Sequence, residues 1–578
     1  MSAATFLGDA HIRWTGTDRP EGDDAYFVGA TFTGDTYFDG SPATGNLYLS
    51  GATFLGDVYF SEIGDNPPGF TGNVYCTDTT FMKKVYFSRT KFAGDVYFTG
   101  TAFEDDAYFT EVTFTNGAYF SRTSTRDREV MGDPTHFAKD VHFDRTTFRN
   151  GSDFSGAIFD GDAYLTRTAF AARADFAGAT FARDAFFSDS RFATARFHET
   201  TFAKGFDAEG STFDHLDFSR AKFDELQRLG PLVADSILLT RASFKNPVVI
   251  EAETTQLSCG GARFTGGAEL RVRHGRVDLA EAFFGSASSL STSAARFSSG
   301  DDRESADHRP VLMSLRSTDV SELALTDVDV RWCRFAGAHH LDKLRIEGVS
   351  LFHKPPRGRW RTSRQVLFEE HLWRAGLRPR EGWLSATPWE PQGGRAEDVG
   401  AERLAAVYRS LRKALEDGKN EAGAGDFYYG EQEARRRADA TSRVEKIILW
   451  AYWLISGYGQ RASRATAALL LLVAVVTSLL IGFGLPSPGP ASQSTTTTTS
   501  SQTVTTTVDL PAQLPPAGQR WTWRRAGDAT RIALGAVVFR DAGQKLTTTG
   551  TWTVMVARFL GPLLLALTAL AIRARVKR

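Results

Sequence analysis

The sequence predicts a mainly β protein: a right-handed, four-sided β-solenoid, followed by an α-helical region and two transmembrane helices. Three observations support this prediction. Phenylalanine recurs at alternating steps of six and five through most of residues 1–226. The same stretch is rich in residues that disfavour helices, and two long apolar segments lie towards the C-terminus.

The repeat is clearest in residues 91–120, KFAGDVYFTGTAFEDDAYFTEVTFTNGAYF. A repeat of fixed period is interpreted first, because it determines the fold. A small or β-branched residue usually precedes each phenylalanine by two positions, as Val96 precedes Phe98. Residues two apart on an extended segment share a face, so each unit directs a small residue and a phenylalanine inward.

Gly-Asp pairs such as Gly94-Asp95 separate the units. Glycine accepts turn dihedrals and aspartate bonds nearby backbone, so these pairs predict corners. Eleven-residue periods also occur in helical repeats, but the recurring Gly, Thr and Asp are poor helix formers. Four sides of five or six residues give a coil of roughly 22 residues, stacked about 4.8 Å from the next. Each buried phenylalanine contributes on the order of 1.5–3 kcal/mol of transfer free energy to this core.

The units at 52–60 (ATFLGDVYF), 91–103 (KFAGDVYFTGTAF) and 173–187 (RADFAGATFARDAFF) resemble the pentapeptide-repeat family in its Phe-centred form. The resemblance is strong over residues 1–226 and weaker over 227–350. It implies a quadrilateral β-helix. It implies no particular activity, because one fold supports many functions.

Residues 227–353 are expected to continue the β-helix with longer, irregular coils, since apolar and polar residues alternate there, as in Glu269-Leu270-Arg271. The start of this region, residues 224–232, is expected to form a short helical turn. The insertions at 61–69 and 121–135 interrupt the repeat and are expected to be solvated loops.

Residues 354–464 form a predicted cytoplasmic and juxtamembrane helical region. Apolar residues at helical spacing predict helices near 366–372 and 402–416, and another from 427 to 437 after a turn at 418–426. The segment 447–456 (IILWAYWLIS) is too short to span a membrane. Its aromatic residues and flanking cations predict a helix in the membrane interface, with a buried core helix as the alternative.

Residues 465–485 carry no charge and are long enough to cross about 30 Å of hydrocarbon. A second predicted span covers 552–572 and ends in a basic tail at 573–578. The Ser/Thr-rich connection 486–551 is expected to be an external linker without a core. Lysine and arginine flank the cytoplasmic ends of spans. Their distribution here places both termini in the cytoplasm, and the N-terminus carries no signal-peptide pattern.

The net charge of −1 conceals an asymmetry. Residues 1–226 hold 34 acidic and 20 basic side chains, a net charge of −14, whereas the remainder carries +13. The three cysteines have unrelated spacings and predict neither a disulfide framework nor a metal site. Cys76 occupies a phenylalanine position of the repeat, which predicts a buried thiol.

The sequence contains no catalytic constellation, cofactor motif or metal-ligand pattern that we would assign, and its histidines are expected to be structural or exposed. We therefore expect a non-enzymatic scaffold that is anchored in a lipid bilayer, the bacterial cell membrane, and binds an unidentified protein partner. No nucleic-acid partner is expected.

Two alternatives remain open. The two spans with a short helix at 530–539 between them resemble the two-helix ion-channel module, which implies a homo-oligomer and a pore loop. Its counterpart here is Thr547, Thr548, Thr549 and Gly550, which departs from the potassium-filter pattern TVGYG. Secondly, some pentapeptide-repeat proteins resemble this chain in carrying an acidic rod that binds DNA-handling enzymes by imitating a duplex.

Overall fold

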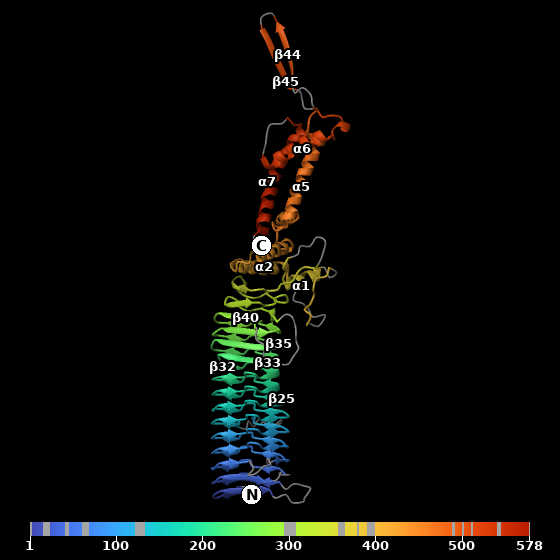
Figure 1. Cartoon of the computed structure of the whole chain (residues 1–578). Helices are drawn as coiled ribbons and strands as arrows, with labels where there is room; N and C mark the ends of the chain where they lie inside the picture. Colours follow the sequence, from blue (N-terminus) through green and yellow to red (C-terminus); the bar gives the residue numbers. More distant parts are fainter. Residues whose placement is uncertain are drawn as a thin grey trace. The chain divides into compact units, whose positions relative to one another are not determined.

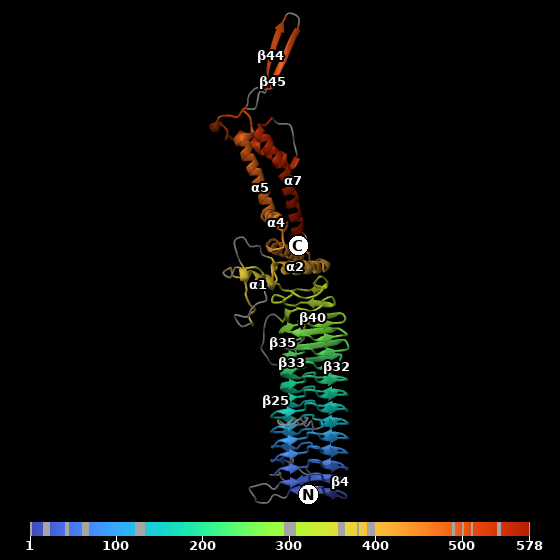
Figure 2. The ribbon, with the colours of Figure 1, turned by 180° about the vertical axis from the view of Figure 1, so that it is seen from behind.

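The structure is a computed structural model that describes residues 3–14, 24–40, 45–60, 69–121, 133–293, 308–356, 364–377, 381–389, 399–487, 492–499, 502–509, 513–539 and 545–576. It forms two compact units (Figures 1 and 2). The first comprises Met1–Val399 with Lys413–Gly418, and the second comprises Gly400–Arg412 with Lys419–Arg578. Both predicted insertions lie almost entirely outside the described residues.

The first unit is a β-solenoid, as the repeat predicts (Figure 1). Its strands pair in parallel, each with its counterpart one coil later. Phe81 pairs with Phe103, 22 residues on, which is the predicted coil length. The coil shortens to 21 residues between Phe181 and Phe202 and to 20 between Phe244 and Phe264.

The sides of the coil build three described sheets. The first sheet contains β1 (Thr5–Phe6), β4 (Thr31–Phe32), β7 (Thr53–Phe54), β11 (Thr80–Phe81), β15 (Ala102–Phe103), β19 (His136–Phe137), β23 (Ile158–Phe159), β26 (Thr180–Phe181), β29 (Thr201–Phe202), β32 (Lys222–Phe223), β34 (Ser243–Phe244), β36 (Arg263–Phe264) and β39 (Phe283–Phe284). The second contains β2 (Ala10–Trp14), β5 (Thr36–Gly40), β8 (Val58–Tyr59), β12 (Val85–Tyr86), β16 (Ala107–Tyr108), β20 (Val141–His142), β24 (Ala163–Tyr164), β27 (Ala185–Phe186) and β30 (Phe206–Asp207).

The third sheet combines the two remaining sides, which β25 joins into one strand. It contains β3 (Ala25–Tyr26), β6 (Leu47–Tyr48), β9 (Gly69–Phe70), β10 (Val74–Tyr75), β13 (Lys91–Phe92), β14 (Val96–Tyr97), β17 (Thr113–Phe114), β18 (Ala118–Tyr119), β21 (Thr147–Phe148), β22 (Ser152–Asp153), β25 (Ala169–Asp175), β28 (Arg191–Arg196), β31 (Thr212–Asp217), β33 (Arg228–Leu238), β35 (Val248–Ser258), β37 (Ala268–Arg273), β38 (Arg276–Asp278), β40 (Ser288–Thr292), β41 (Val311–Ser314), β42 (Leu323–Thr326) and β43 (Arg345–Glu347).

Stacked phenylalanine rings fill the core. One column runs from Phe6 to Phe284 with one phenylalanine from each strand of the first sheet, and successive ring centroids lie 4.5–5.4 Å apart. This spacing matches the distance between neighbouring strands. In other columns Leu165 and Cys76 replace a phenylalanine and are buried, and the burial of Cys76 confirms the prediction.

Residues 224–232 do not form the predicted helical turn. Arg228–Leu238 is instead a long strand, β33, in which Leu229 and Leu232 are buried. The reason lies in the neighbouring coils, since β33 pairs with β31 and β35 on either side. Interstrand hydrogen bonds thus override a weak local preference for helix.

The helix α1 (Phe368–Leu377) and the short η1 (Leu341–Lys343) complete the first unit. The helix predicted near 366–372 begins at Phe368, and Val366 and Leu367 before it and His371 within it are buried. Glu369 receives hydrogen bonds from the backbone N–H groups of Phe335 and Ala336, which belong to the last coils of the solenoid. The Glu369 carboxylate thus accepts hydrogen bonds from backbone N–H groups that the next coil would accept in the middle of the solenoid, so it caps the end of the solenoid.

The second unit is mainly helical. Its helices are α2 (Ala401–Asp417), whose last turn from Lys413 belongs to the first unit, α3 (Glu421–Arg437), α4 (Arg443–Ser456), α5 (Ala462–Leu479), η2 (Leu480–Gly484), η3 (Ala517–Gln519), α6 (Trp523–Leu534), η4 (Gly535–Phe539) and α7 (Thr548–Val576). The predicted turn at 418–426 is shorter than expected. Asn420 caps α3 by accepting a hydrogen bond from the N–H of Gly423, so the helix begins at Glu421.

The predicted linker 486–551 also contains regular structure. The strands β44 (Ser492–Thr499) and β45 (Gln502–Asp509) form an antiparallel hairpin, and α6 with η4 follows. Threonine predominates in both strands and has a high strand propensity.

Candidate functional site

The corner carboxylates of the solenoid hold its coils together. The backbone N–H of Lys84 donates to the carboxylate of Asp57 over 3.1 Å, and that of Asp95 donates to the side-chain oxygen of Asn73 over 2.9 Å. These partners lie one coil apart, whereas the sequence predicts a bond within the same turn. The corner aspartates therefore have a structural role, and their frequency in the repeat is explained without a role in acid–base catalysis.

Tyrosines between the corners form outward-facing ladders. Tyr26, Tyr48, Tyr75, Tyr97 and Tyr119 stack with centroid distances of 4.6–5.0 Å. Burial, and then the charge of the neighbouring aspartate, raises the pKa of Tyr59 and of Tyr97 to about 12. These phenols are neutral near pH 7 and contribute packing and hydrogen bonds rather than charge.

Ion pairs between coils neutralise part of the negative charge on the solenoid surface. Glu111 lies 2.9 Å from Arg145 and 3.2 Å from Arg89, and hydrogen bonds from these two side chains lower its pKa. Further pairs are Lys84–Asp106, Arg196–Asp175, Lys204–Glu225, Arg220–Glu199 and Lys245–Asp224. Interspersed cations differ from the uniform phosphate charge of a duplex, so the DNA-mimic hypothesis gains no support here and stays a hypothesis.

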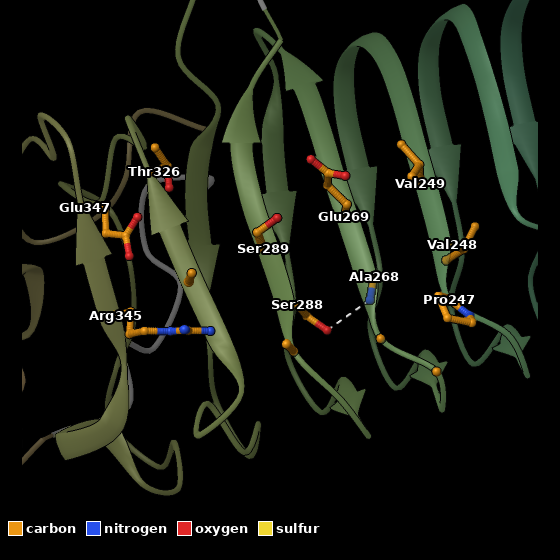
Figure 3. Close-up of a pocket in the computed structure, with 14 residues that line it drawn as sticks. Pro247, Val248, Val249, Ala268, Glu269, Ser288, Ser289, Thr326, Arg345 and Glu347 are labelled. Atoms are coloured by element: carbon orange, nitrogen blue, oxygen red, sulfur yellow. Dashed lines mark hydrogen bonds between the residues drawn. The ribbon is translucent and has the colours of Figure 1, made fainter.

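A pocket of about 500 Å³ opens on the third sheet, across β35, β37, β40, β42 and β43 (Figure 3). It is hollow because small residues such as Gly267, Ala268 and Ala287 line it. Glu269, Arg345 and Glu347 supply charge. Arg345 and Glu347 are exposed and form no ion pair within the described part of the chain, so both are available to a partner. No sequence pattern indicates this pocket, because its residues meet only through the coil register.

A buried cluster of aromatic rings and two histidines surrounds α1. The rings of His353 and His371 lie 4.9 Å apart, and those of Trp332 and Phe368 lie 5.3 Å apart. Burial lowers the pKa of both histidines to about 4, so they are neutral at pH 7. His340 is exposed and lies 3.0 Å from Asp319. In the described residues no three His, Cys, Asp or Glu side chains are placed to share a metal ion.

Each of the three cysteines is buried and free of disulfide bonds. Burial raises the pKa of Cys76, Cys259 and Cys333, so the thiolate form is scarce at neutral pH. They are packing residues rather than nucleophiles.

Two helices in the second unit are long and apolar enough to cross a membrane. They are Ala462–Gly484, with 23 residues, and Thr548–Arg573, with 26 residues. The first begins before the predicted span 465–485 and ends one residue short of it, and the second contains the whole predicted span 552–572. The backbones of the two helices meet at Gly484 and Gly550, where a Cβ on Gly550 would lie 2.8 Å from the Cα of Gly484. Glycine is required here for close approach.

α4 exposes several apolar side chains, and its position in a membrane interface stays a prediction. Ile447, Ile448 and Leu454 are 67%, 61% and 53% exposed, and Val444 and Trp450 are exposed on the same helix. Other residues of α4 pack on α3, where the indole N–H of Trp453 donates to the hydroxyl of Tyr429. A soluble helix would bury such a face.

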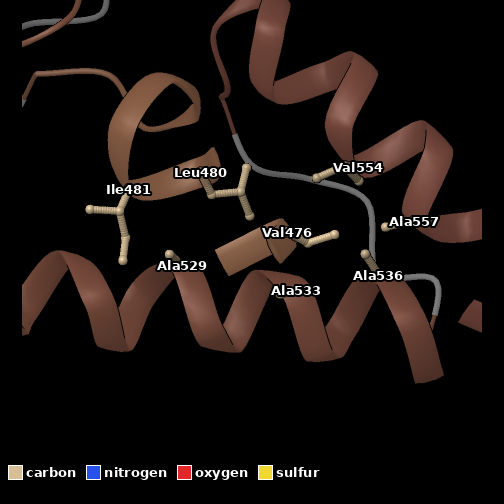
Figure 4. Close-up of a cluster of buried hydrophobic side chains, with 8 residues drawn as sticks. All are labelled: Val476, Leu480, Ile481, Ala529, Ala533, Ala536, Val554 and Ala557. Atoms are coloured by element: carbon tan, nitrogen blue, oxygen red, sulfur yellow. The ribbon is translucent and has the colours of Figure 1, made fainter. Parts of the chain in front are cut away.

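α6 and η4 return alongside the two long helices (Figure 4). Their buried alanines Ala529, Ala533 and Ala536 pack against Val476, Leu480 and Ile481 from α5 and η2, and against Val554 and Ala557 from α7. Arg525 donates to the carbonyl oxygens of Leu485 and Pro486 at the end of the first long helix. The sequence predicts a helix only from 530 to 539, whereas the element begins at Trp523.

Thr547, Thr548, Thr549 and Gly550 lie at the start of α7. The Thr547 side chain accepts a hydrogen bond from the N–H of Gly550, as an N-cap does, and its own N–H donates to the carbonyl of Gly484. The carbonyl oxygens of Thr547 and Thr549 accept bonds from Thr551 and Thr553 in the first helical turn. Within one chain these carbonyls thus belong to a helix rather than to an extended filter.

Comparison with known proteins agrees with the solenoid geometry. The sequence profile of a family described as pentapeptide repeats (9 copies) matches residues 22–63, 77–124 and 135–180. No curated protein and no solved structure matched the chain. The matched segments lie in the coils whose phenylalanines stack in register, and these segments therefore carry pentapeptide repeats, the family that the sequence resembles.

Proposed function

We propose that this protein is a non-enzymatic scaffold, anchored in a membrane, that presents its pentapeptide-repeat solenoid to a protein partner. One observation carries the proposal. A single chain contains both a β-solenoid, whose coils are hydrogen-bonded to one another, and two helices that are long enough to cross a bilayer. The acidic and aromatic side chains of the regular coils are used to hold the coils together, which suits a rigid support.

The anchor has three parts. α5 with η2 and α7 cross the bilayer, and the exposed apolar face of α4 lies in the interface beside them. Arg443 and Lys446 on α4, and Arg464 near the start of α5, favour the anionic cytoplasmic leaflet. Both termini then lie in the cytoplasm, and residues 486–551 lie outside.

The pocket between Glu269 and Arg345 is the partner surface that the described coils support best. It is concave, it combines small apolar residues with unpaired charges, and its residues lie on a regular sheet that holds them in place. A protein segment with its own charged side chains fits this chemistry better than an apolar ligand does.

Two experiments test the proposal with the full-length protein in cells. Membrane fractionation should leave the chain in the pellet until detergent is added, and external protease should cut only within residues 486–551. Recovery without detergent would contradict the anchor, and cleavage of residues 1–440 would reverse the orientation. A photo-crosslinking residue at Ser289, in the pocket, should capture a discrete partner that the same residue at exposed Glu209 does not capture.

A second candidate is an oligomeric ion-conducting protein. The return of α6 and η4 alongside both long helices favours it, because a pore-lining segment must enter the bilayer between the spans. One hairpin cannot enclose a pore, so this function requires several copies. Bilayer recordings of the purified protein test it, and absence of conductance from an oligomer would exclude it.

A further inference from the structure

The α6–η4 segment extends far along the membrane hairpin. Arg525, in the first turn of α6, donates to the carbonyl oxygens of Leu485 and Pro486, and the buried alanines that follow share a cluster with Val476 of α5, so α6 runs back along α5 (Figure 4). Further on, a Cβ on Gly561 would lie 2.9 Å from the Cα of Val537. Gly561 is about 20 Å from the start of α7 at 1.5 Å per residue. Val537 therefore lies well within the thickness of a bilayer if α7 spans it.

One face of this segment is uncovered. Its exposed residues recur at three- and four-residue steps, which places them in one stripe along the helix. Leu534 and Val538 are 45% and 48% exposed. The charged members, Arg524, Asp528 and Arg531, form no ion pair within the described residues. The stripe is thus charged in the first turns of α6 and apolar at the end of α6 and in η4.

Hydrocarbon is a poor environment for this face. Ionisable residues at membrane depth almost always contact other protein or a water-filled cavity. The bilayer alone does not meet this requirement.

We propose that a second copy of this chain covers the stripe, so that the protein self-associates in the membrane through α6 and η4. The charges are self-complementary: Asp528 of one copy can pair with Arg524 or Arg531 of the next, while Leu534 and Val538 meet their counterparts below. The proposal rests on the membrane anchoring proposed above. It requires no conduction, and an oligomer without a pore satisfies it.

Cysteine crosslinking in native membranes tests the contact. The native thiols are buried, so the background is low. Full-length Leu534→Cys should form a disulfide-linked dimer on mild oxidation, whereas Phe559→Cys, on an exposed face of α7, should not. Absence of the Leu534→Cys dimer from a membrane-embedded protein would overturn the proposal. Recovery of the protein without detergent would instead overturn the anchoring on which it rests.

Charge exchange provides an independent test. Asp528→Arg should weaken self-association by about tenfold, measured as the oligomer fraction in lipid nanodiscs, because it replaces an attractive pair by a repulsive one. The double variant Asp528→Arg/Arg531→Asp should restore association. A monomeric wild-type protein, or equal association of all three proteins, would refute the contact between copies.

Discussion

The carboxylate of Asp35 accepts a hydrogen bond of 2.9 Å from the backbone N–H of Asp57, one coil further along the chain. Asn46 accepts the equivalent bond from the N–H of Asn73 over 2.8 Å. The side-chain oxygen, not the charge, is thus the shared feature. These bonds tie the backbone of each coil to the next at its corners.

Asp35→Ala should destabilise the adjoining coils by about 1 kcal/mol, because the N–H of Asp57 loses its acceptor. Asp35→Asn is the matched control and should leave stability unchanged, since the chain itself uses asparagine in this role. Hydrogen exchange of residues 31–60 in the full-length protein measures the difference. Equal protection in the two variants would show that the bond contributes nothing.

The phenylalanine columns predict a graded response to truncation. Phe143 stacks on Phe109 with a centroid distance of 4.7 Å, and Leu165 occupies the next position of the same column. Phe143→Ala should cost about 3–5 kcal/mol of unfolding free energy, since it leaves a cavity in a closely packed core. Phe143→Leu should cost less than half of that, because leucine is already accommodated one coil away. Denaturant unfolding followed by local hydrogen exchange compares the two, and equal losses would contradict a specific stacking column.

The cysteines should resist thiol reagents in the folded protein. Burial raises the pKa of each of the three thiols and blocks access. A maleimide should therefore label none of them over an hour at pH 7 and all three in denaturant, as counted by mass spectrometry. Rapid labelling of Cys76 in the native protein would place it outside the phenylalanine core.

The histidines beside α1 make this region sensitive to acid. Burial lowers the pKa of His353 and His371 to about 4, below the ordinary value of 6.5. The unfolded chain therefore binds more protons between these two values, and stability falls as the pH drops from about 6.5 towards 4. Hydrogen exchange of residues 368–377, corrected for its intrinsic pH dependence, should increase at pH 5 relative to pH 7.

Variants separate this effect from general acid sensitivity. His371→Phe should reduce the pH dependence, because it removes one buried group that gains a proton on unfolding. His340→Asn should leave it unchanged, since His340 is exposed. An unchanged pH profile in both variants would refute the assignment.

The period of the repeat predicted the solenoid, because the phenylalanine spacing is a local property that the fold preserves. Contacts between coils were harder to predict. The partner of Asp57 lies 27 residues away at Lys84, across an insertion, and sequence reasoning placed it in the same turn. The helical turn predicted at 224–232 is wrong for the same reason, because β33 is extended through its pairing with strands of the neighbouring coils. Both long apolar helices were evident from composition, whereas the N-cap role of Thr547 depends on its contact with Gly484.

The exposed face of α4 provides a direct test of the membrane interface. A fluorophore on Ile448→Cys should shift to shorter wavelength in nanodiscs, and brominated lipids should quench it, because the Ile448 side chain is 61% exposed. The same label on Glu209→Cys, on the solenoid, should remain unquenched. Adding Ile447→Asp should reduce quenching at Ile448 without releasing the protein from the membrane, since α5 and α7 still hold it. A shift without quenching would indicate that protein covers the face, and unshifted emission would mean that α4 remains in water.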